Sequence, residues 1–375
     1  MHKLGPERAI LVQLVEHRRN KEEAAESLAE LENLADTAGA EVVGSITQRR
    51  DRPNVAFYIG EGKLAEVQLA CRQAGANMVI FDNELTPVQV NNLDLALGLK
   101  VIDRTELILQ IFARRARSAE SQIQVELAQL QYLVQRIPVS VKQARFTGGI
   151  GMRGPGESPF QLRNAPMRRR IRDLKEKLDL IQQRRERMQE RRPWPVVSIV
   201  GYTNAGKSTL LNAFAAGADA YVDDRLFATL DTKTRRVRVA QDRDVMMADT
   251  VGFIRNLPHG LVASFRSTLA VAANADLLLI VVDTGHPRVD DHLAVVADTL
   301  KEIGADQVPS LLLLNKCDNP ASQAALPALT ERHPGAMEVS ALRKDGLQQV
   351  KEAIDDALSR ANAYRKPGRP DPAGA

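Results

Sequence analysis

The sequence predicts an α/β protein made of an amino-terminal α/β domain, a long antiparallel helical hairpin and a second α/β domain with a mostly parallel sheet and helices on both faces. Two observations support this prediction. The 375 residues exceed the roughly 100–200 residues of one ordinary domain. Strand-like and helix-like patterns also alternate along most of the chain. We expect boundaries at residues 1–104, 105–192 and 193–362, followed by an unstructured tail at 363–375.

The amino-terminal domain is predicted from short apolar runs that alternate with helical patterns. The runs predict strands at 9–15, 42–46, 78–81 and 100–102. Apolar residues at helical spacing predict helices at 21–39, 64–74 and 87–97, the last opened by Thr86 and Pro87. We see no catalytic constellation in this domain.

Two apolar stripes predict the helical hairpin. The first stripe, on one helix from about 105 to 137, comprises Ile123, Leu127, Leu130, Val134 and Ile137. The second, on a helix from 164 to 192, comprises Ile171, Leu174, Leu178, Ile181 and Met188. The connecting tip, residues 145–160, holds five glycines between 148 and 156. Trp194, bracketed by two prolines, marks a hinge or a packed domain junction.

Composition excludes several classes of protein. No apolar run approaches the ~18–20 residues that span a bilayer, so we expect no membrane insertion. Two cysteines offer neither a disulfide framework nor a zinc site, which favours a reducing, cytoplasmic location. We expect a monomer.

A glycine-rich segment from Gly201 to Ser208 has the spacing of a phosphate-binding loop. It lies between an apolar run, 196–200, and a helical pattern, 209–214, which is the context that such a loop requires. Successive backbone N–H groups and the helix amino terminus would cradle a β-phosphate. Lys207 would neutralise the β- and γ-phosphates, and Ser208 would bind Mg²⁺.

The base of the nucleotide is predicted from Asn315-Lys316-Cys317-Asp318, directly after the strand-like run 310–314. The Asp318 carboxylate can accept hydrogen bonds from guanine N1–H and the exocyclic amine, neither of which adenine offers. A site built on such bonds can discriminate by up to ~10⁴-fold. Downstream, Ser340 and Ala341 end another predicted strand, where a backbone N–H can meet guanine O6. Together these segments predict GTP rather than ATP.

Two further segments would respond to the γ-phosphate. In Asp249-Thr250-Val251-Gly252, the aspartate would hold Mg²⁺ through water, and the glycine N–H could approach the γ-phosphate because no Cβ intervenes. In the polar stretch Phe227-Ala228-Thr229-Leu230-Asp231, the threonine hydroxyl could complete the Mg²⁺ shell. Loss of the γ-phosphate would release the contact at Gly252, so hydrolysis would change the shape of the protein.

With these motifs in place, the sequence resembles the HflX-type GTPases, of the Obg–HflX group of P-loop GTPases. The resemblance covers nearly the whole chain, through GYTNAGKST, LFATLD, DTVGFI, NKCD and VSAL, and through GGIGMRGPGE on the hairpin. It implies a P-loop GTPase domain and Thr229 as the switch-I magnesium ligand. It also implies that the amino-terminal domain and hairpin bind the large ribosomal subunit, and that the GTP-bound protein splits or rescues stalled ribosomes under stress.

The motifs and the resemblance together give a set of site residues. The expected catalytic residues are Lys207, Thr229 and Gly252. The expected GTP contacts are Gly201, Tyr202, Thr203, Asn204, Ala205, Gly206, Lys207, Ser208, Phe227, Ala228, Thr229, Leu230, Asp231, Asp249, Thr250, Val251, Gly252, Asn315, Lys316, Cys317, Asp318, Ser340, Ala341 and Leu342. Mg²⁺ is expected on Ser208 and Thr229, with Asp249 binding through water. The chain departs from the family pattern at 158–163 and at Thr232.

Two residues bear on the rate of hydrolysis. Many small GTPases orient the attacking water with a glutamine directly after Asp-x-x-Gly, but here that residue is Phe253, which cannot hydrogen-bond through its side chain. We therefore expect slow intrinsic hydrolysis that a partner, the ribosome, stimulates. Asn204 is a candidate to orient a monovalent cation such as K⁺ beside the phosphates.

The charge distribution bears on partners. Residues 161–192 hold twelve Lys or Arg and five Asp or Glu, so this segment carries 12 − 5 = +7 against +4 for the whole chain. A solvated helix face is the ordinary explanation of such a run. Its arginine richness and the glycine-rich tip favour ribosomal RNA instead, with Arg153, Arg168, Arg169 and Arg170 as candidate contacts.

Two other functions stay open at this point. The chain could be a nucleotide-gated adaptor that docks a protein partner through the hairpin as a coiled coil. It could also couple RNA to ATP hydrolysis in the amino-terminal domain, although no phosphate-loop motif occurs there.

Overall fold

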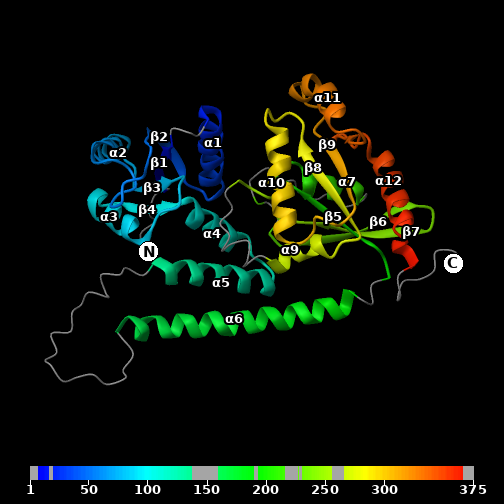
Figure 1. The fold of residues 1–375 in the computed structure, drawn as a ribbon, viewed down its shortest axis with the longest axis horizontal. Coiled ribbons are helices and arrows are strands. Elements are labelled where there is room, and N and C mark those ends of the chain that lie inside the picture. Colours follow the sequence, from blue (N-terminus) through cyan, green and yellow to red (C-terminus); the bar gives the residue numbers. More distant parts are fainter. Residues whose placement is uncertain are drawn as a thin grey trace. The chain divides into compact units, whose positions relative to one another are not determined.

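The computed structural model describes residues 7–16, 20–136, 159–189, 193–215, 227, 230–255 and 266–365. The chain forms two compact units, each built around its own β-sheet (Figure 1). The amino-terminal unit takes in Met1–Arg114 and Ile123–Lys177, and the carboxyl-terminal unit takes in Arg115–Gln122 and Leu178–Ala375. The predicted α/β class is therefore confirmed.

The amino-terminal unit is built on a four-stranded parallel sheet of order β2-β1-β3-β4. Its elements are β1 (Arg8–Val15), α1 (Lys21–Thr37), β2 (Glu41–Arg49), α2 (Glu61–Ala74), β3 (Met78–Phe81), α3 (Pro87–Leu97) and β4 (Lys100–Asp103). All the predicted strands and helices are present, with ends that differ by a few residues. Val12 of β1 lies in one apolar cluster with Leu93 of α3, and the next residue, Gln13, donates to the Ala24 carbonyl of α1. Both faces of β1 are therefore covered.

A buried polar network fills the carboxyl-terminal edge of this sheet between β1 and β3, where the strand order reverses. In open parallel sheets, ligands bind in a crevice at such a point. Here the buried Arg104 forms ion pairs with Asp82 and Glu30. The Ser27 hydroxyl and the Gln13 amide donate to the same Asp82 carboxylate at 2.6 and 3.0 Å. The described polar side chains at this edge are therefore engaged with one another.

The prediction of one helix from residue 105 to 137 is wrong. The segment forms two helices, α4 (Arg104–Arg115) and α5 (Ala119–Arg136). Ser118 starts the second helix, because its Oγ accepts a hydrogen bond from the Ser121 N–H at 3.1 Å, the arrangement of an N-cap. A serine followed three residues later by a polar residue was the available signal, and the good helical periodicity on both sides concealed it.

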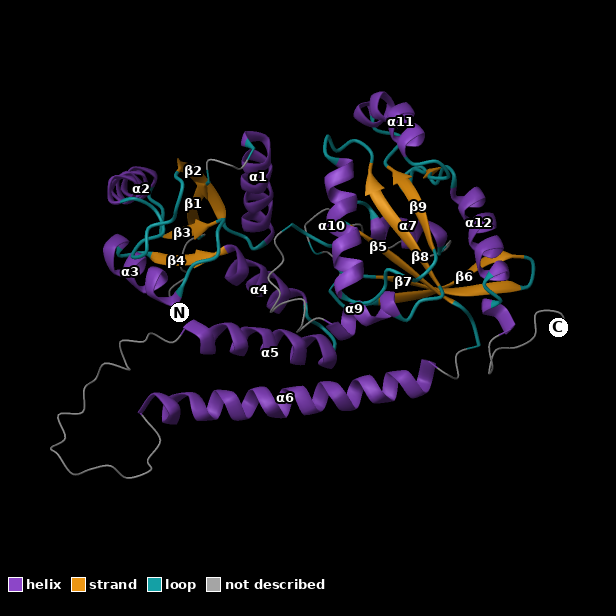
Figure 2. Cartoon of the chain, viewed as in Figure 1, coloured by secondary structure: helices purple, strands orange, loops and turns teal. Residues whose placement is uncertain are grey.

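The second helix of the hairpin, α6 (Pro159–Gln189), begins five residues before the predicted start. Its covered side chains include the predicted stripe of Ile171, Leu174, Leu178 and Ile181. The helix runs antiparallel to α5 (Figure 2), and the Arg170 guanidinium binds the Glu126 carboxylate of α5 through Nε–Oε1 and Nη2–Oε2 contacts of 2.6 and 2.8 Å. The predicted tip, up to residue 158, lies outside the described residues. Neither α6 nor any other described helix combines the length and apolar character needed to cross a bilayer.

The carboxyl-terminal unit is built on a six-stranded sheet of order β10-β9-β8-β5-β7-β6, in which only β6 runs antiparallel to its neighbour. Its elements are β5 (Val196–Gly201), α7 (Lys207–Phe214), β6 (Lys233–Ala240), β7 (Arg243–Asp249), α9 (Arg266–Ala273), β8 (Leu277–Asp283), α10 (Val289–Glu302), β9 (Ser310–Asn315), α11 (Pro320–Arg332), β10 (Met337–Glu338) and α12 (Leu347–Arg360). Ile199 packs with residues of α7 and α12, and Val200 packs with residues of α9 and α10. Helices therefore cover both faces, as predicted.

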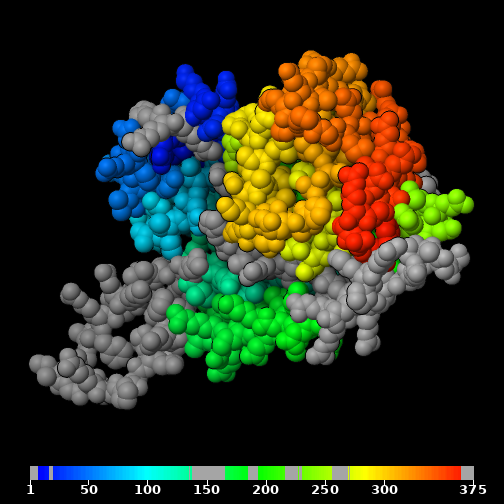
Figure 3. Space-filling view, turned by 45° about the vertical axis from the view of Figure 1, so that its right-hand side comes forward, coloured from blue at the N-terminus to red at the C-terminus, as the bar shows by residue number. Residues whose placement is uncertain are grey.

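The predicted unstructured tail begins later than expected. Ala363–Arg365 form a 3₁₀ turn, η2, directly after α12. Ala363 and Tyr364 are buried in the same cluster as α12, and the Tyr364 hydroxyl donates to the Asp355 carboxylate at 3.0 Å. In the space-filling view α12, in red, lies against the light-green edge of the sheet at β6 and β7 (Figure 3). An isolated tyrosine in a Pro/Gly-rich tail does not by itself predict this packing. Residues 366–375 lie outside the described residues.

Trp194 packs within the carboxyl-terminal unit. The Arg236 guanidinium of β6 lies over its ring, 4.5 Å from the centroid, which is a cation–π contact. Of the two interpretations that the sequence left open for Trp194, this contact supports packing at the start of the unit.

Candidate nucleotide-binding site

The predicted phosphate loop lies at the carboxyl end of β5 and leads into α7. Gly201 has φ of +153°, and a Cβ on it would overlap the Val281 carbonyl of β8. Gly206 precedes α7 with φ of +91°, and a Cβ there would overlap the Asn315 side-chain amide. Only glycine fits at either position, so the loop keeps its backbone N–H groups close to the helix amino terminus.

Lys207 and Ser208 are the first two residues of α7 and directly follow the phosphate loop. The Lys207 Nζ donates to the Tyr202 carbonyl at 2.7 Å inside the loop. Burial lowers the pKa of Lys207 to about 8, although Asp249 partly opposes the shift. Ser208 Oγ donates to Asp249 Oδ2 at 2.6 Å, so the structure brings together two of the three predicted Mg²⁺ ligands. Paired hydroxyl and carboxylate oxygens suit that cation.

The Asp-x-x-Gly segment lies directly against the phosphate loop. The Phe253 N–H donates to the Gly201 carbonyl at 3.1 Å, and the Thr203 N–H donates to the Phe253 carbonyl at 2.7 Å. A Cβ on Gly252 would stand 2.8 Å from both Lys207 Nζ and Thr203 Cα. Because Gly252 has no side chain, this segment can lie close to the phosphate loop.

Phe253 occupies the position at which many small GTPases carry a glutamine, and its ring is turned into the core. It is 1% exposed and packs in one cluster with Val200 and Leu269. The side chain can neither reach nor hydrogen-bond a water beside the γ-phosphate. The apolar residue therefore has a structural role here.

Asn315 connects three of the predicted nucleotide motifs. It ends β9 and is almost fully buried. Its side-chain amide donates to the Ala205 carbonyl of the phosphate loop at 2.8 Å and accepts from the Ala341 N–H at 3.0 Å. The hydrogen bonds of one side chain thus fix the distance between the phosphate end and the base end of the site.

The predicted guanine-reading residues are held by their neighbours. Asp318 Oδ1 accepts from the Ser340 hydroxyl at 2.6 Å, and Ser340 Oγ accepts from the Arg343 N–H at 3.0 Å. Lys316 adopts a left-handed backbone with φ of +65° and pairs with Asp283 at 2.7 Å. These contacts orient the Asp318 carboxylate before a base arrives, which reduces the entropy lost on binding.

Cys317 and Leu342 flank the guanine-reading residues and contribute no polar contact to them. The Cys317 thiol donates to the Leu314 carbonyl, and burial raises its pKa above the ordinary value. Leu342 is 74% exposed. Both residues were predicted as GTP contacts. In this structure they could contact GTP through their backbone or apolar atoms.

The loop after β8 contains site residues that sequence reasoning missed. Asp283 anchors Lys316, and Thr284, fully buried, bonds the Asn315 carbonyl through both its N–H and its hydroxyl, at 3.1 and 2.7 Å. The sequence does contain a signal for these residues, since Asp-Thr-Gly follows directly on a buried strand. Polar residues at the carboxyl ends of parallel strands gather at one edge of the sheet.

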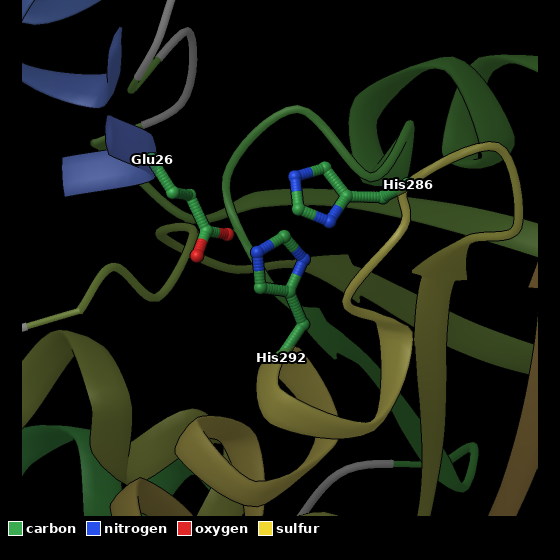
Figure 4. A group of neighbouring side chains, drawn as sticks. All are labelled: Glu26, His286 and His292. Carbon is green, nitrogen blue, oxygen red and sulfur yellow. The ribbon is translucent and has the colours of Figure 1, made fainter. Parts of the chain in front are cut away.

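A stack of rings supports the phosphate loop from the side of α10. The Tyr202 and His292 rings are parallel, with centroids 3.8 Å apart. The His286 ring stacks on the other side-chain ring of this pair, that of His292, with centroids 4.1 Å apart, and Figure 4 shows these two histidines. The Tyr202 hydroxyl also accepts from the Arg255 N–H, two residues after Phe253, at 2.8 Å. Burial is the main cause that lowers the pKa of His292 to about 3, so the ring is neutral at physiological pH.

Of the predicted contacts in the segment before β6, the structure describes Phe227, Leu230 and Asp231. Phe227 and Leu230 are buried, 3% and 2% exposed, so their side chains serve packing. The Asp231 carboxylate accepts hydrogen bonds from the Arg117 N–H and from the N–H and hydroxyl of Ser118. Ala228, Thr229 and Arg153 are outside the described residues.

A phosphate loop, a nearby Asp-x-x-Gly and a preorganised Asn-Lys-x-Asp on this sheet define a P-loop GTPase. The family model described as "50S ribosome-binding GTPase" matches residues 196–316. Models described as "GTP-binding GTPase N-terminal" and "GTP-binding GTPase Middle Region" match 25–113 and 115–192. GTPases of this class hydrolyse GTP with the help of Mg²⁺.

Comparison with whole proteins identifies the family. GTPase HflX of Caldanaerobacter subterraneus is 46% identical over 94% of this chain and 81% of its own length, and GTPase HflX of Escherichia coli is 41% identical over 94% and 83%. A crystal structure of SsGBP in complex with GDP is 27% identical, with a TM-score of 0.53 over 94% of this chain and 99% of that one. The chain belongs to the HflX family of GTPases.

Proposed function

We propose that this GTPase binds the large ribosomal subunit and uses GTP binding and hydrolysis as a switch that splits or rescues stalled ribosomes under stress. The observation that carries the proposal is the exposed basic face of α6, which includes Arg168 and Arg169. Arginine side chains of this kind suit the phosphates of RNA. The description of the family model for residues 196–316 supports the same partner.

At residue level we propose the following roles for the switch. Lys207, Thr229 and Gly252 act on the γ-phosphate, Ser208 and Thr229 bind Mg²⁺ directly, and Asp249 binds it through water. The phosphate loop and the Asn315–Asp318 motif hold the nucleotide, with Ser340 and Ala341 at the base. We also propose a functional division at residues 1–104, 105–192 and 193–362, in which the first two segments carry the ribosome contacts.

Hydrolysis in this proposal needs help from outside the chain. Phe253 is buried, so positioning of the attacking water falls to the bound partner or to a cation. Asn204, exposed and left-handed with φ of +60°, is the candidate to orient K⁺. Equal hydrolysis rates in potassium and sodium buffers would rule out a role of K⁺ in hydrolysis. If the isolated protein hydrolyses GTP fast and ribosomal subunits leave the rate unchanged, stimulation by the ribosome would be ruled out.

Co-sedimentation with purified large subunits, in GTP, GDP and a non-hydrolysable GTP analogue, tests the proposed partner. We expect binding that weakens with salt and depends on the nucleotide. Arg170 already bonds Glu126, so its replacement would also disturb the α5–α6 contact. The variant of choice is therefore R168Q/R169Q, and it should reduce the slope of log affinity against log salt by about 2, roughly one for each phosphate that is no longer neutralised.

A matched control removes the same charge at another place. The double variant K351Q/R360Q does so on α12, and its binding should equal that of the wild type. If R168Q/R169Q binds as the wild type does, the basic face of α6 is an ordinary solvated helix face and does not bind RNA. If a partner is instead retained after RNase treatment and subunit binding is absent, the adaptor function replaces the ribosomal one.

A further inference from the structure

Backbone and side-chain hydrogen bonds join the Asp-x-x-Gly segment to the phosphate loop. The Phe253 N–H donates to the Gly201 carbonyl at 3.1 Å, and the Thr203 N–H donates to the Phe253 carbonyl at 2.7 Å. A further bond comes from a side chain, because the Tyr202 hydroxyl accepts from the Arg255 N–H at 2.8 Å. The backbone bonds do not depend on the side chain at position 202, whereas the last bond needs the tyrosine hydroxyl.

The start of α10 holds the Tyr202 side chain in place. The side chain is buried, and its ring stacks on the His292 ring, with centroids 3.8 Å apart and an interplanar angle of 3°. The preceding residue, Asp291, pairs with the Arg255 guanidinium at 3.5 Å and also with Arg288. Consecutive residues of α10 therefore contact the two residues that form the hydroxyl bond. A partner that is already oriented loses little conformational entropy when it accepts a hydrogen bond.

The segment held in this way includes the glycine of the Asp-x-x-Gly motif. A Cβ on Gly252 would stand 2.8 Å from Lys207 Nζ, so the two groups lie next to each other. Lys207 Nζ in turn donates to the Tyr202 carbonyl at 2.7 Å. Tyr202 therefore contacts Lys207 through its main chain and contacts Arg255, three residues after Gly252, through its side chain. Donors that stabilise a transition state are effective only when they are held in position beforehand.

We propose that Tyr202 is a positioning residue for GTP hydrolysis. By holding Arg255, its hydroxyl keeps the N–H of Gly252 beside the Lys207 ammonium group. The ring of Phe253 lies in the core, so its side chain offers no polar contact that could orient the segment instead. This role of Tyr202 rests on the action proposed for Gly252 at the γ-phosphate, and it does not depend on the ribosomal partner.

The variant Y202F tests this role, because it removes the hydroxyl and keeps the ring on His292. Single-turnover GTP hydrolysis by the isolated full-length protein should slow by about 5-fold, the equivalent of one ordinary hydrogen bond. GDP affinity should change by less than about 2-fold, because the bond lost lies on the Asp-x-x-Gly segment. The amide of Arg255 should exchange its hydrogen at least about 5-fold faster, because that amide has lost its acceptor. Thermal melting checks that the variant is folded.

The matched control is Y364F, which removes a hydroxyl that donates to Asp355 at 3.0 Å in the same unit. It should keep the wild-type hydrolysis rate and the wild-type exchange at Arg255. A wild-type hydrolysis rate in Y202F, or an Arg255 amide that exchanges as before, would overturn the proposal and leave Tyr202 a packing residue. If G252A hydrolyses GTP as fast as the wild type, the action proposed for Gly252 fails, while exchange at Arg255 still reports whether Tyr202 holds the segment.

Discussion

The side-chain amide of Asn315 lies 2.8 Å from the carbonyl oxygen of Ala205, and this hydrogen bond ties the guanine-reading motif to the phosphate loop. The same side chain accepts from the Ala341 N–H at 3.0 Å. Asn315 is 1% exposed, so water cannot replace either bond. The geometry of the nucleotide site therefore depends on one buried amide whose own backbone carbonyl is held by Thr284.

We expect N315A to weaken both nucleotide binding and stability. The change leaves the Ala205 carbonyl and the Ala341 N–H without partners, at a cost of ~1–3 kcal/mol for each buried group. GTP and GDP affinities should fall together, because neither bond touches the γ-phosphate. Chemical denaturation and fluorescent-nucleotide titration measure the two effects. The control N319A removes the N-cap of α11 and should cost only about 1 kcal/mol of stability, without an effect on affinity.

Asp318 should decide which purine is bound. In D318N the side-chain oxygen can still accept from N1–H, but the new NH₂ group faces the guanine amine, donor against donor. GTP affinity should fall by at least ~100-fold, since bonds to a charged group contribute ~1.5–3 kcal/mol each. Xanthine carries a carbonyl in place of that amine, so the variant should prefer XTP. Competition titrations with GTP, XTP and ATP measure this preference, and an unchanged order would contradict the assignment.

Removal of the hydroxyl that holds Asp318 should have a smaller effect. S340A removes the 2.6 Å hydrogen bond to the carboxylate but leaves both of its interactions with guanine possible. We expect GTP affinity to fall by roughly 3–10-fold, the equivalent of one ordinary hydrogen bond of about 1 kcal/mol. Purine preference should be kept. Loss of preference in S340A would mean that Ser340 reads the base itself.

We expect G252A to impair hydrolysis more than binding. The new Cβ would stand 2.8 Å from Thr203 Cα, a backbone atom, so the Asp-x-x-Gly segment must move away from the phosphate loop. The N–H at this position then no longer reaches the γ-phosphate, and the hydrolysis rate should fall at least ~10-fold, as when other transition-state donors are removed. GDP affinity should change little. G62A in α2, where a Cβ meets nothing within 4 Å, is the control and should leave both quantities unchanged.

Stability below neutral pH should depend on His292. Burial foremost, with the nearby charges of His286 and Arg255, lowers its pKa to about 3, whereas Asp283 and Asp291 act in the opposite sense. The unfolded chain binds a proton at the ordinary pKa of about 6.5, so this group destabilises the fold as the pH falls from about 6.5 towards 3. Between about pH 6.5 and 4.5 the decrease in stability should be about 2 kcal/mol.

The variant H292F keeps a ring against Tyr202 and removes the titration. Its free energy of unfolding should therefore fall less steeply over that pH range than that of the wild type. Urea denaturation at several pH values gives both profiles. Parallel profiles would show that His292 does not carry the effect.

The sequence determined the local structure closely, because local structure depends on nearby residues. Thr86 and Pro87 start α3 as predicted, and Gln89 completes the capping box. The phosphate loop, Asp-x-x-Gly and Asn-Lys-x-Asp were recognisable because each is a short run whose chemistry is contained in consecutive residues. The break between α4 and α5 was missed because apolar periodicity continues across it and outweighed the single cap signal of Ser118.

Only the tertiary structure could decide which distant groups share a contact. Nothing near Asp231 in the sequence indicates that its carboxylate binds the amino terminus of a helix more than a hundred residues earlier. Likewise, the stack of Tyr202 on His292 and the pairing of Asp283 with Lys316 follow from parallel strands that bring their carboxyl ends to one edge. The motifs of this GTPase are set by consecutive residues, whereas the contacts between the motifs are set by the arrangement of strands in the sheet.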